Sequence, residues 1–270
     1  MKIAIVQMGS TSNKEENVEA TYRLLERAKG SELVVFPEYQ LYVPTFESKE
    51  DMTHVSESID GSFIKSMIET AQRENQKILV NIPEKNYFNL KPFNSAIYID
   101  ELGLILKYRK LHLFDAFNFR ESNVFEKGDM PPRIFNGSGD PIGVQICYDL
   151  RFPEPARILA LNGAKIIIYQ AGWFAGERKY DQWKTLLKTR AMENGVFVVG
   201  AAQTGERFTG HSMVISPYGD ILAEMGMEEG VVTMDIDFSL IDKYRDEVPV
   251  IRHRRTDIYD VLDVDAFKMI

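Results

Sequence analysis

Short apolar runs alternate with amphipathic stretches along most of the chain. Lys2–Gln7 (KIAIVQ) and residues 33–36 (LVVF) have the length and β-branched content of buried strands. Between them, Asn13 with Glu16 three residues later forms a capping-box pattern, which predicts a helix running to about Ala28. A strand–helix–strand alternation of this kind is typical of α/β domains. We therefore expect an α/β fold.

The same alternation continues through the remainder of the sequence. Residues 101–103 (ELG) predict a short turn between two antiparallel strands, and residues 111–140 combine several Gly and Pro without a clear period, which indicates a long functional loop region. Further strands are predicted at 77–82, 95–100, 104–108, 141–147, 166–170, 196–202, 210–216, 221–224 and 231–235, and further helices at 62–75, 155–162 and 180–193.

No stretch of linker composition interrupts this pattern, so we expect residues 1–270 to form a single domain. Residues 248–270 are charged and aromatic without a clear period. We interpret them as a C-terminal tail that packs at a subunit interface.

Charge and cysteine content limit the possible partners and compartments. With 32 Lys and Arg against 40 Asp and Glu, the net charge is −8, which disfavours nucleic acids and anionic membranes as partners. The apolar run at the N-terminus is too short for a signal peptide or a membrane span. A single cysteine forms no intramolecular disulfide and no multi-cysteine zinc site, so we expect a cytoplasmic location. We expect no metal and no cofactor, since metal-ligand spacing is lacking among the histidines, His54, His112, His211 and His253.

Three chemically reactive side chains follow predicted strands. Glu38 comes after LVVFP, Lys110 after LILKYR, and Cys147 after IGVQI. Because ligands bind outside the carboxyl ends of the strands in α/β sheets, we expect these three side chains to converge in one pocket.

Each residue taken alone has an ordinary structural interpretation. A lone cysteine after a strand is most often a small buried hydrophobe, Glu38 suits a helix terminus or the surface, and Lys110 suits a solvated charge. A Cys–His arrangement with His112 is a further alternative, as is a thiol redox sensor that uses glutathione or a second subunit. A binding or scaffold protein on a retired hydrolase fold also remains open.

Three segments containing these residues resemble the catalytic motifs of the nitrilase superfamily of carbon–nitrogen hydrolases. They are FPEYQLY (36–42), YRKLHLF (108–114) and ICYDLRFPEPAR (146–157), and their order and separations also fit. Residues 190–203, 210–224 and 248–259 resemble other parts of the same family, so the resemblance covers essentially the whole chain.

The resemblance implies a four-layer α-β-β-α sandwich and a Glu-Lys-Cys triad. Glu38 would be the general base and acid, Lys110 the cation and Cys147 the nucleophile. Glu121 matches a second family glutamate that braces the lysine and the substrate amide. All four positions are filled, which argues against a retired scaffold. The resemblance also implies a homodimer or a higher homo-oligomer in which C-terminal tails are exchanged.

These residue types suit acyl transfer from an amide. A free thiol has a pKa of about 8.5, so a base such as Glu38 must remove its proton. The same carboxylic acid can then protonate the leaving nitrogen and later activate water against the thioester. Lys110 and the backbone N–H of Tyr148 are the expected donors to the oxyanion.

The substrate class follows from the nucleophile motif. CYD replaces the CWE typical of nitrile-cleaving members, and CYDLRFPE resembles branches that act on ω-amides and deaminated glutathione. We therefore expect hydrolysis of a small aliphatic amide with release of ammonia or an amine; N-carbamoyl compounds and nitriles are the alternatives. Residues 171–183 depart from the ω-amidase pattern, which leaves the contacts to a substrate carboxylate open.

Four further residues are candidates for binding substrate. Arg151 could clamp a carboxylate bidentately, or it could form a structural ion pair with Asp149 or Glu154. The others are aromatic residues that either line the pocket or pack in the core, namely Tyr42, Trp173 and Phe174.

Overall fold

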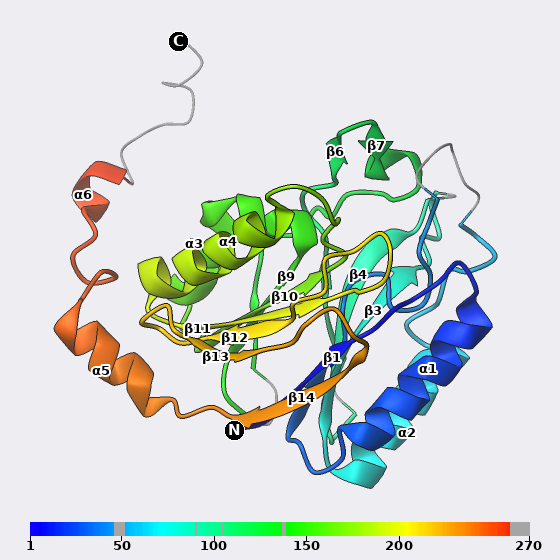
Figure 1. The fold of residues 1–270 in the computed structure, drawn as a ribbon, viewed down its shortest axis with the longest axis horizontal. Helices are drawn as coiled ribbons and strands as arrows, with labels where there is room; N and C mark the ends of the chain where they lie inside the picture. The colour runs from blue at the N-terminus through cyan, green and yellow to red at the C-terminus, as the bar shows by residue number, and fades with distance from the viewer. Residues whose placement is uncertain (46–51, 90, 104, 137–138, 260–270) are drawn as a thin grey trace.

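Two six-stranded sheets pack face to face, and a pair of helices covers the outer face of each (Figure 1). The computed structural model describes residues 1–45, 52–89, 91–103, 105–136 and 139–259. This arrangement is the four-layer α-β-β-α sandwich that the resemblance implied, and the expectation is confirmed.

The first sheet has β1, β2 and β3 running parallel, with antiparallel strands at both edges. Since the β3–β4 and β4–β5 pairs are both antiparallel, β5 runs in the same direction as β3. The carboxyl ends of β2, β3 and β5 therefore lie on the same side of the sheet. In order across the sheet, the strands are β14 (Gly230–Asp235), β1 (Lys2–Gln7), β2 (Leu33–Val35), β3 (Lys77–Glu84), β4 (Phe93–Ile99) and β5 (Ile105–Arg109).

The helices α1 (Lys14–Arg27) and α2 (Ser62–Glu74) cover the outer face of this sheet. The Asn13 side chain accepts hydrogen bonds from the backbone N–H groups of Glu15 and Glu16, so the predicted N-cap of α1 is confirmed.

The second sheet has three parallel central strands, β9, β10 and β11. Its outer face is covered by α3 (Pro153–Leu161) and α4 (Lys179–Asn194). In order across the sheet, the strands are β13 (Ile221–Glu224), β12 (Met213–Ile215), β11 (Phe197–Ala202), β10 (Ile166–Ala171), β9 (Ile142–Ile146) and β8 (Ile134–Phe135).

Burial on both faces explains why the central strands are continuous apolar runs. In β1, Ile3 and Ile5 belong to the core between the sheets, whereas Ala4 and Val6 pack in the layer beneath α1 and α2. Successive side chains of a strand point to opposite faces, so a strand covered on both sides must be apolar at every position.

Two regions differ from the sequence-based expectation. The predicted loop at 111–140 contains a small hairpin of β6 (Asp115–Ala116) and β7 (Phe119–Arg120), the 3₁₀ turn η1 (Glu121–Asn123) and β8. Strands of two residues are too short to show a period of two, so no strand was predicted in this region.

The segment that leads to the C-terminus contains two helices that the sequence did not predict, α5 (Ser239–Glu247) and α6 (Thr256–Tyr259). Only Ile241 and Tyr244 of α5 are buried, and so narrow an apolar stripe gives little periodic signal. Both helices lie to one side of the sandwich (Figure 1). The predicted tail extends to residue 270, and its last part, 260–270, lies outside the described residues.

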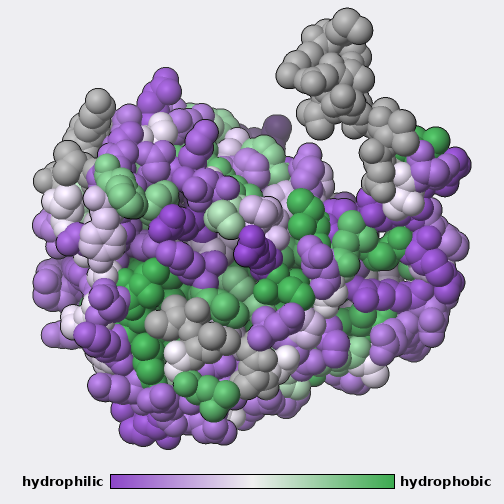
Figure 2. Space-filling view, turned by 180° about the vertical axis from the view of Figure 1, so that it is seen from behind, coloured by the Kyte–Doolittle hydropathy of each residue, from purple (hydrophilic) through white to green (hydrophobic). Residues whose placement is uncertain are grey.

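The surface is mostly polar. On the face opposite to that of Figure 1, apolar side chains gather towards the middle and hydrophilic ones surround them (Figure 2). None of the helices in the described part of the chain combines the length and apolar character needed to cross a membrane.

Candidate active site

Cys147 lies at a sharp turn where β9 ends and the 3₁₀ helix η2 (Cys147–Arg151) begins. Its backbone has a φ of 46°, a left-handed conformation that costs a residue with a side chain about 1–3 kcal/mol. Asp149 holds this turn, because its carboxylate accepts a hydrogen bond from the N–H of Ile146 at 3.0 Å and another from the Tyr108 hydroxyl at 2.8 Å. The strand therefore ends at Cys147, as expected, in a tight turn held in one conformation, which we call the elbow.

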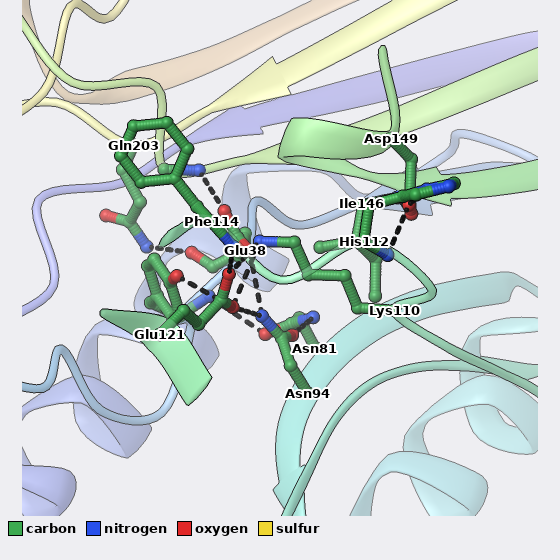
Figure 3. A network of polar contacts seen from close by, with 12 residues as sticks. Glu38, Asn81, Asn94, Lys110, His112, Phe114, Glu121, Ile146, Asp149 and Gln203 are labelled. Carbon is green, nitrogen blue, oxygen red and sulfur yellow. Dashed lines mark hydrogen bonds and ion pairs between the residues drawn. The ribbon is translucent and has the colours of Figure 1, made fainter. Parts of the chain in front are cut away.

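A buried cation sits between two buried carboxylates. Lys110 Nζ lies 2.8 Å from Glu38 Oε1 and 2.7 Å from Glu121 Oε2, and these side chains are at most 1% exposed. Glu38 follows β2, Lys110 follows β5, and Glu121 opens η1. Figure 3 shows the three side chains meeting. The structure thus brings Glu38 and Lys110, which were predicted at separate strand ends, together with Glu121, which was expected from the resemblance.

Further hydrogen bonds fix the Glu38 carboxylate. The backbone N–H of Gly172 donates to its Oε2 at 2.7 Å, and Asn94 Nδ2 donates to its Oε1 at 2.8 Å and to Glu121 Oε1 at 3.0 Å. A Cβ at Gly172 would lie 2.7 Å from the Tyr39 ring, so glycine is needed for this close approach. The Tyr39 hydroxyl donates to Glu121 Oε1 at 3.1 Å.

Sequence analysis did not identify Asn94, Tyr39 or Gly172. A signal was present for Asn94, since it is a polar residue within the buried strand β4 and buried polar groups require hydrogen-bond partners. Its side-chain oxygen accepts from Asn81 Nδ2 at 2.9 Å (Figure 3).

Burial and the neighbouring charges shift the pKa values in the site. Burial raises the pKa of Glu38, against the attraction of Lys110 and together with repulsion from Glu121. Burial alone would lower the pKa of Lys110, but the charges of Glu121 and Glu38 outweigh it and raise that pKa. Burial, followed by the charge of Glu38, raises the pKa of Cys147. At neutral pH the free site therefore holds a protonated thiol beside a charged lysine.

A small chamber of about 20 Å³ lies beside Cys147. Its position between the ends of β5, β9 and β10 is the crevice in which ligands were expected. Its walls are formed by Tyr39, Lys110, Phe114, Cys147, Tyr148, Arg151, Gly172, Trp173, Phe174 and Lys179.

The predicted substrate-binding residues divide into two groups. Arg151, Trp173 and Phe174 line the chamber. Tyr42 is not among its wall residues; it is buried in the apolar cluster that also contains Tyr39, edge-on to His54 with ring centroids 5.9 Å apart. Tyr39 takes the place at the chamber that the sequence suggested for Tyr42.

Arg151 forms no ion pair with Asp149 or Glu154, the two partners that the sequence left open. In the described part of the chain, its guanidinium donates to Gln182 Oε1 at 2.8 Å and lies 4.7 Å from the centroid of the Trp173 ring. Lys179, which sequence analysis missed, lines the same chamber. Burial, with the nearby charge of Arg151, lowers the pKa of Lys179. Two cationic side chains thus border the chamber in addition to Lys110.

His112 does not form a dyad with Cys147 in this structure. Its Nδ1 lies 2.7 Å from Asp149 Oδ1, and its ring stacks on Phe152 with centroids 3.7 Å apart. Within the described ranges, no group of three or more His, Cys, Asp or Glu side chains is arranged to hold a metal ion.

A family model and several known proteins are similar to this chain in sequence. A family model described as carbon–nitrogen hydrolase matches residues 2–246. A nitrilase and fragile histidine triad fusion protein of Drosophila melanogaster is 36% identical over 271 residues, which cover 95% of this chain but only 58% of that protein. An ω-amidase NIT2 of Bos taurus is 31% identical over 274 residues, covering 96% of this chain and 97% of the relative.

Two solved structures have the same fold. The C. elegans NitFhit protein superposes with a TM-score of 0.86 at 30% identity, covering 96% of this chain and 66% of that one. Saccharomyces cerevisiae Nit3, described as a member of branch 10 of the nitrilase superfamily, superposes with a TM-score of 0.83 at 29% identity, covering 94% and 96%.

Proposed function

We propose that this chain, which belongs to the carbon–nitrogen hydrolase family, hydrolyses the amide bond of a small molecule with Cys147 as its nucleophile. One observation carries the proposal: Cys147 and Lys110 line one small buried chamber, and Glu38 is hydrogen-bonded to that lysine. A thiol, a cation and a carboxylate in one chamber are the parts that acyl transfer requires.

Glu38 moves the protons of the reaction. As the Cys147 sulfur bonds to the amide carbon, the thiol proton passes to the Glu38 carboxylate. The same proton then goes to the nitrogen as the C–N bond breaks, which releases ammonia or an amine and leaves a thioester. A water molecule gives a proton to Glu38 and attacks the thioester, releasing the acid and restoring the thiol. The raised pKa of Glu38 suits a group that must both accept and return a proton.

Lys110 and the backbone N–H of Tyr148 stabilise the oxyanion that forms on the amide oxygen. Lys110 keeps its charge in a buried site because Glu38 and Glu121 lie within 3.0 Å of it. Losing one oxyanion donor of this kind costs about 3–4 kcal/mol of transition-state stabilisation. Glu121 braces the ammonium group with both of its carboxylate oxygens, at 3.0 and 2.7 Å.

The preferred substrate is an amide whose acyl group carries a carboxylate. Arg151 and Lys179 both line the chamber, and a guanidinium is suited to bidentate contact with a carboxylate. The bovine relative is named as an ω-amidase, which agrees with this class. N-carbamoyl compounds and nitriles are the alternative substrates.

We also infer the organisation of the chain and its assembly. The core between the sheets includes residues of both, which supports a single domain over residues 1–270. Ile158 and Leu161 on α3 and Met192 on α4 are exposed apolar side chains, which supports a homodimer or a higher homo-oligomer built on these helices and the C-terminal segment. A free catalytic thiol fits a reducing, cytoplasmic compartment.

Release of ammonia from a panel of compounds tests the proposed reaction. The panel contains succinamate, acetamide, an N-carbamoyl amino acid and a simple nitrile. Turnover of succinamate that disappears in Cys147→Ala supports an amidase. Preferred turnover of the nitrile or the N-carbamoyl compound would replace it with the corresponding alternative. Absence of turnover together with a Cys147 that does not react with iodoacetamide would instead support a binding or scaffold protein.

A further inference from the structure

The chamber at Cys147 adjoins a far larger cavity. The inner chamber measures about 20 Å³ and the outer one about 580 Å³, and Phe114, Phe174 and Lys179 line both. A chamber of the inner size holds little more than one water-sized group. The bulk of any larger substrate must therefore lie in the outer cavity, which we call the vestibule.

Four of the ten wall residues of the vestibule are phenylalanines. The rings of two of them, Phe119 and Phe174, stack with centroids 4.6 Å apart. Its volume lies within the range of about 300–1,000 Å³ that is typical of small-molecule sites. Among the residues that the structure describes, the walls are formed by Thr45, Phe114, Phe117, Asn118, Phe119, Phe174, Ala175, Lys179, Glu206 and Arg207.

The β6–β7 hairpin carries two of the wall residues of the vestibule, Phe117 and Phe119. The turn residues Phe117 and Asn118 have φ values of 52° and 68°, a conformation that disfavours a bulky residue. Phe117 is nevertheless aromatic, and its side chain is exposed. Lys179 Nζ lies 4.4 Å from the centroid of its ring. An exposed ring held in a strained turn stabilises the fold poorly, which points to a role in binding.

We propose that the vestibule binds an aromatic or comparably apolar group of the substrate, several atoms away from the scissile amide. The inference rests on the proposed hydrolysis through Cys147. Stacking on Phe117 and Phe119 would hold the apolar group while the amide enters the inner chamber. The group can belong to either the acyl part or the amine part of the amide.

Three amides test the inference and distinguish the two positions. Acetamide is the small reference, 4-phenylbutyramide extends the acyl part, and N-benzylacetamide extends the amine part. Burial of one phenyl ring predicts a kcat/KM at least about tenfold above that of acetamide for one of the extended amides. Released ammonia and benzylamine are measured with the same amine-reactive reagent. If neither extended amide exceeds acetamide, the inference is overturned, while turnover of acetamide through Cys147 would leave the proposed function intact.

Substitutions in the hairpin locate the binding site. Phe117→Ala and Phe119→Ala are each expected to lower the ratio of kcat/KM between the preferred aryl amide and acetamide by about two- to tenfold, because each removes one stacking partner. Phe88→Ala is the matched control, since Phe88 is a fully exposed phenylalanine outside both cavities. Circular dichroism verifies folding. An unchanged ratio in both hairpin variants, or an equal loss in Phe88→Ala, would overturn the assignment.

Discussion

Lys110 Nζ lies 2.8 Å from Glu38 Oε1, and neither side chain is exposed to solvent. Glu121 lies on the same ammonium group at 2.7 Å, so one cation compensates two buried carboxylates. Removing the cation would leave two buried negative charges facing each other. This relationship links the stability of the fold to the chemistry of the site.

Lys110→Met is expected to lower the free energy of unfolding by about 3–5 kcal/mol near neutral pH, the cost of breaking a buried ion pair. The attraction of Lys110 lowers the pKa of Glu38, so the variant has a carboxyl whose folded-state pKa is still higher than in the wild type. Such a group binds more protons in the folded state than in the unfolded state, and its stabilising contribution is lost as the pH rises through the folded-state pKa.

The loss in free energy of unfolding that Lys110→Met causes should therefore be larger at about pH 8 than at about pH 5. Urea unfolding at both pH values measures it, with the exposed Lys65→Met as the control. A deficit that does not depend on pH would contradict the account of the paired charges.

Asn94→Ala is expected to shift the acidic limb of the pH profile. Glu38 must be ionised to accept the thiol proton, so kcat/KM falls as the pH drops through its raised pKa. Asn94 donates to the Glu38 carboxylate at 2.8 Å and thereby favours the charged form. Its removal raises the pKa of Glu38 further and moves the acidic limb of kcat/KM to higher pH. Asn162→Ala, on the surface at the end of α3, should leave the profile in place.

Asp149→Asn is expected to disturb the elbow of Cys147. An amide in place of the carboxylate presents an NH₂ group towards donors that include the Ile146 N–H and the Tyr108 hydroxyl. Loss of such buried hydrogen bonds costs about 1–3 kcal/mol, and a displacement of about 1 Å at the nucleophile costs about a hundredfold in rate. We expect kcat to fall more than KM changes. The exposed Asp181→Asn is the control, and wild-type kcat in Asp149→Asn would contradict a positioning role.

Arg151→Gln is expected to reduce selectivity for substrates that carry a carboxylate. A hydrogen bond to a charged group contributes about 1.5–3 kcal/mol, so the ratio of kcat/KM between succinamate and its uncharged diamide should fall about ten- to a hundredfold. Steady-state kinetics with both substrates measure this ratio. The exposed Arg73→Gln is the matched control. An unchanged ratio in Arg151→Gln would assign the contact to another residue lining the chamber.

The sequence predicted the strand ends well because the central strands are covered on both faces and are therefore continuous apolar runs. It also predicted that Glu38, Lys110 and Cys147 would meet near the carboxyl ends of strands, although the strands belong to both sheets. The partners of Glu38 were harder to predict, because Gly172 reaches Glu38 across 134 residues of sequence and from the opposite sheet. Lys179 was missed because it lies at the start of α4 within a charged stretch that resembles a solvated helix end.

Intact-mass measurement after rapid acid quenching tests the central claim most directly. During turnover of a substrate amide, the protein should gain the mass of the acyl group, with the adduct on Cys147, while ammonia or an amine is released. Cys147→Ala should show neither the adduct nor turnover. Turnover at the wild-type rate in Cys147→Ala, or an acyl adduct on another residue, would contradict the assignment of Cys147 as the nucleophile.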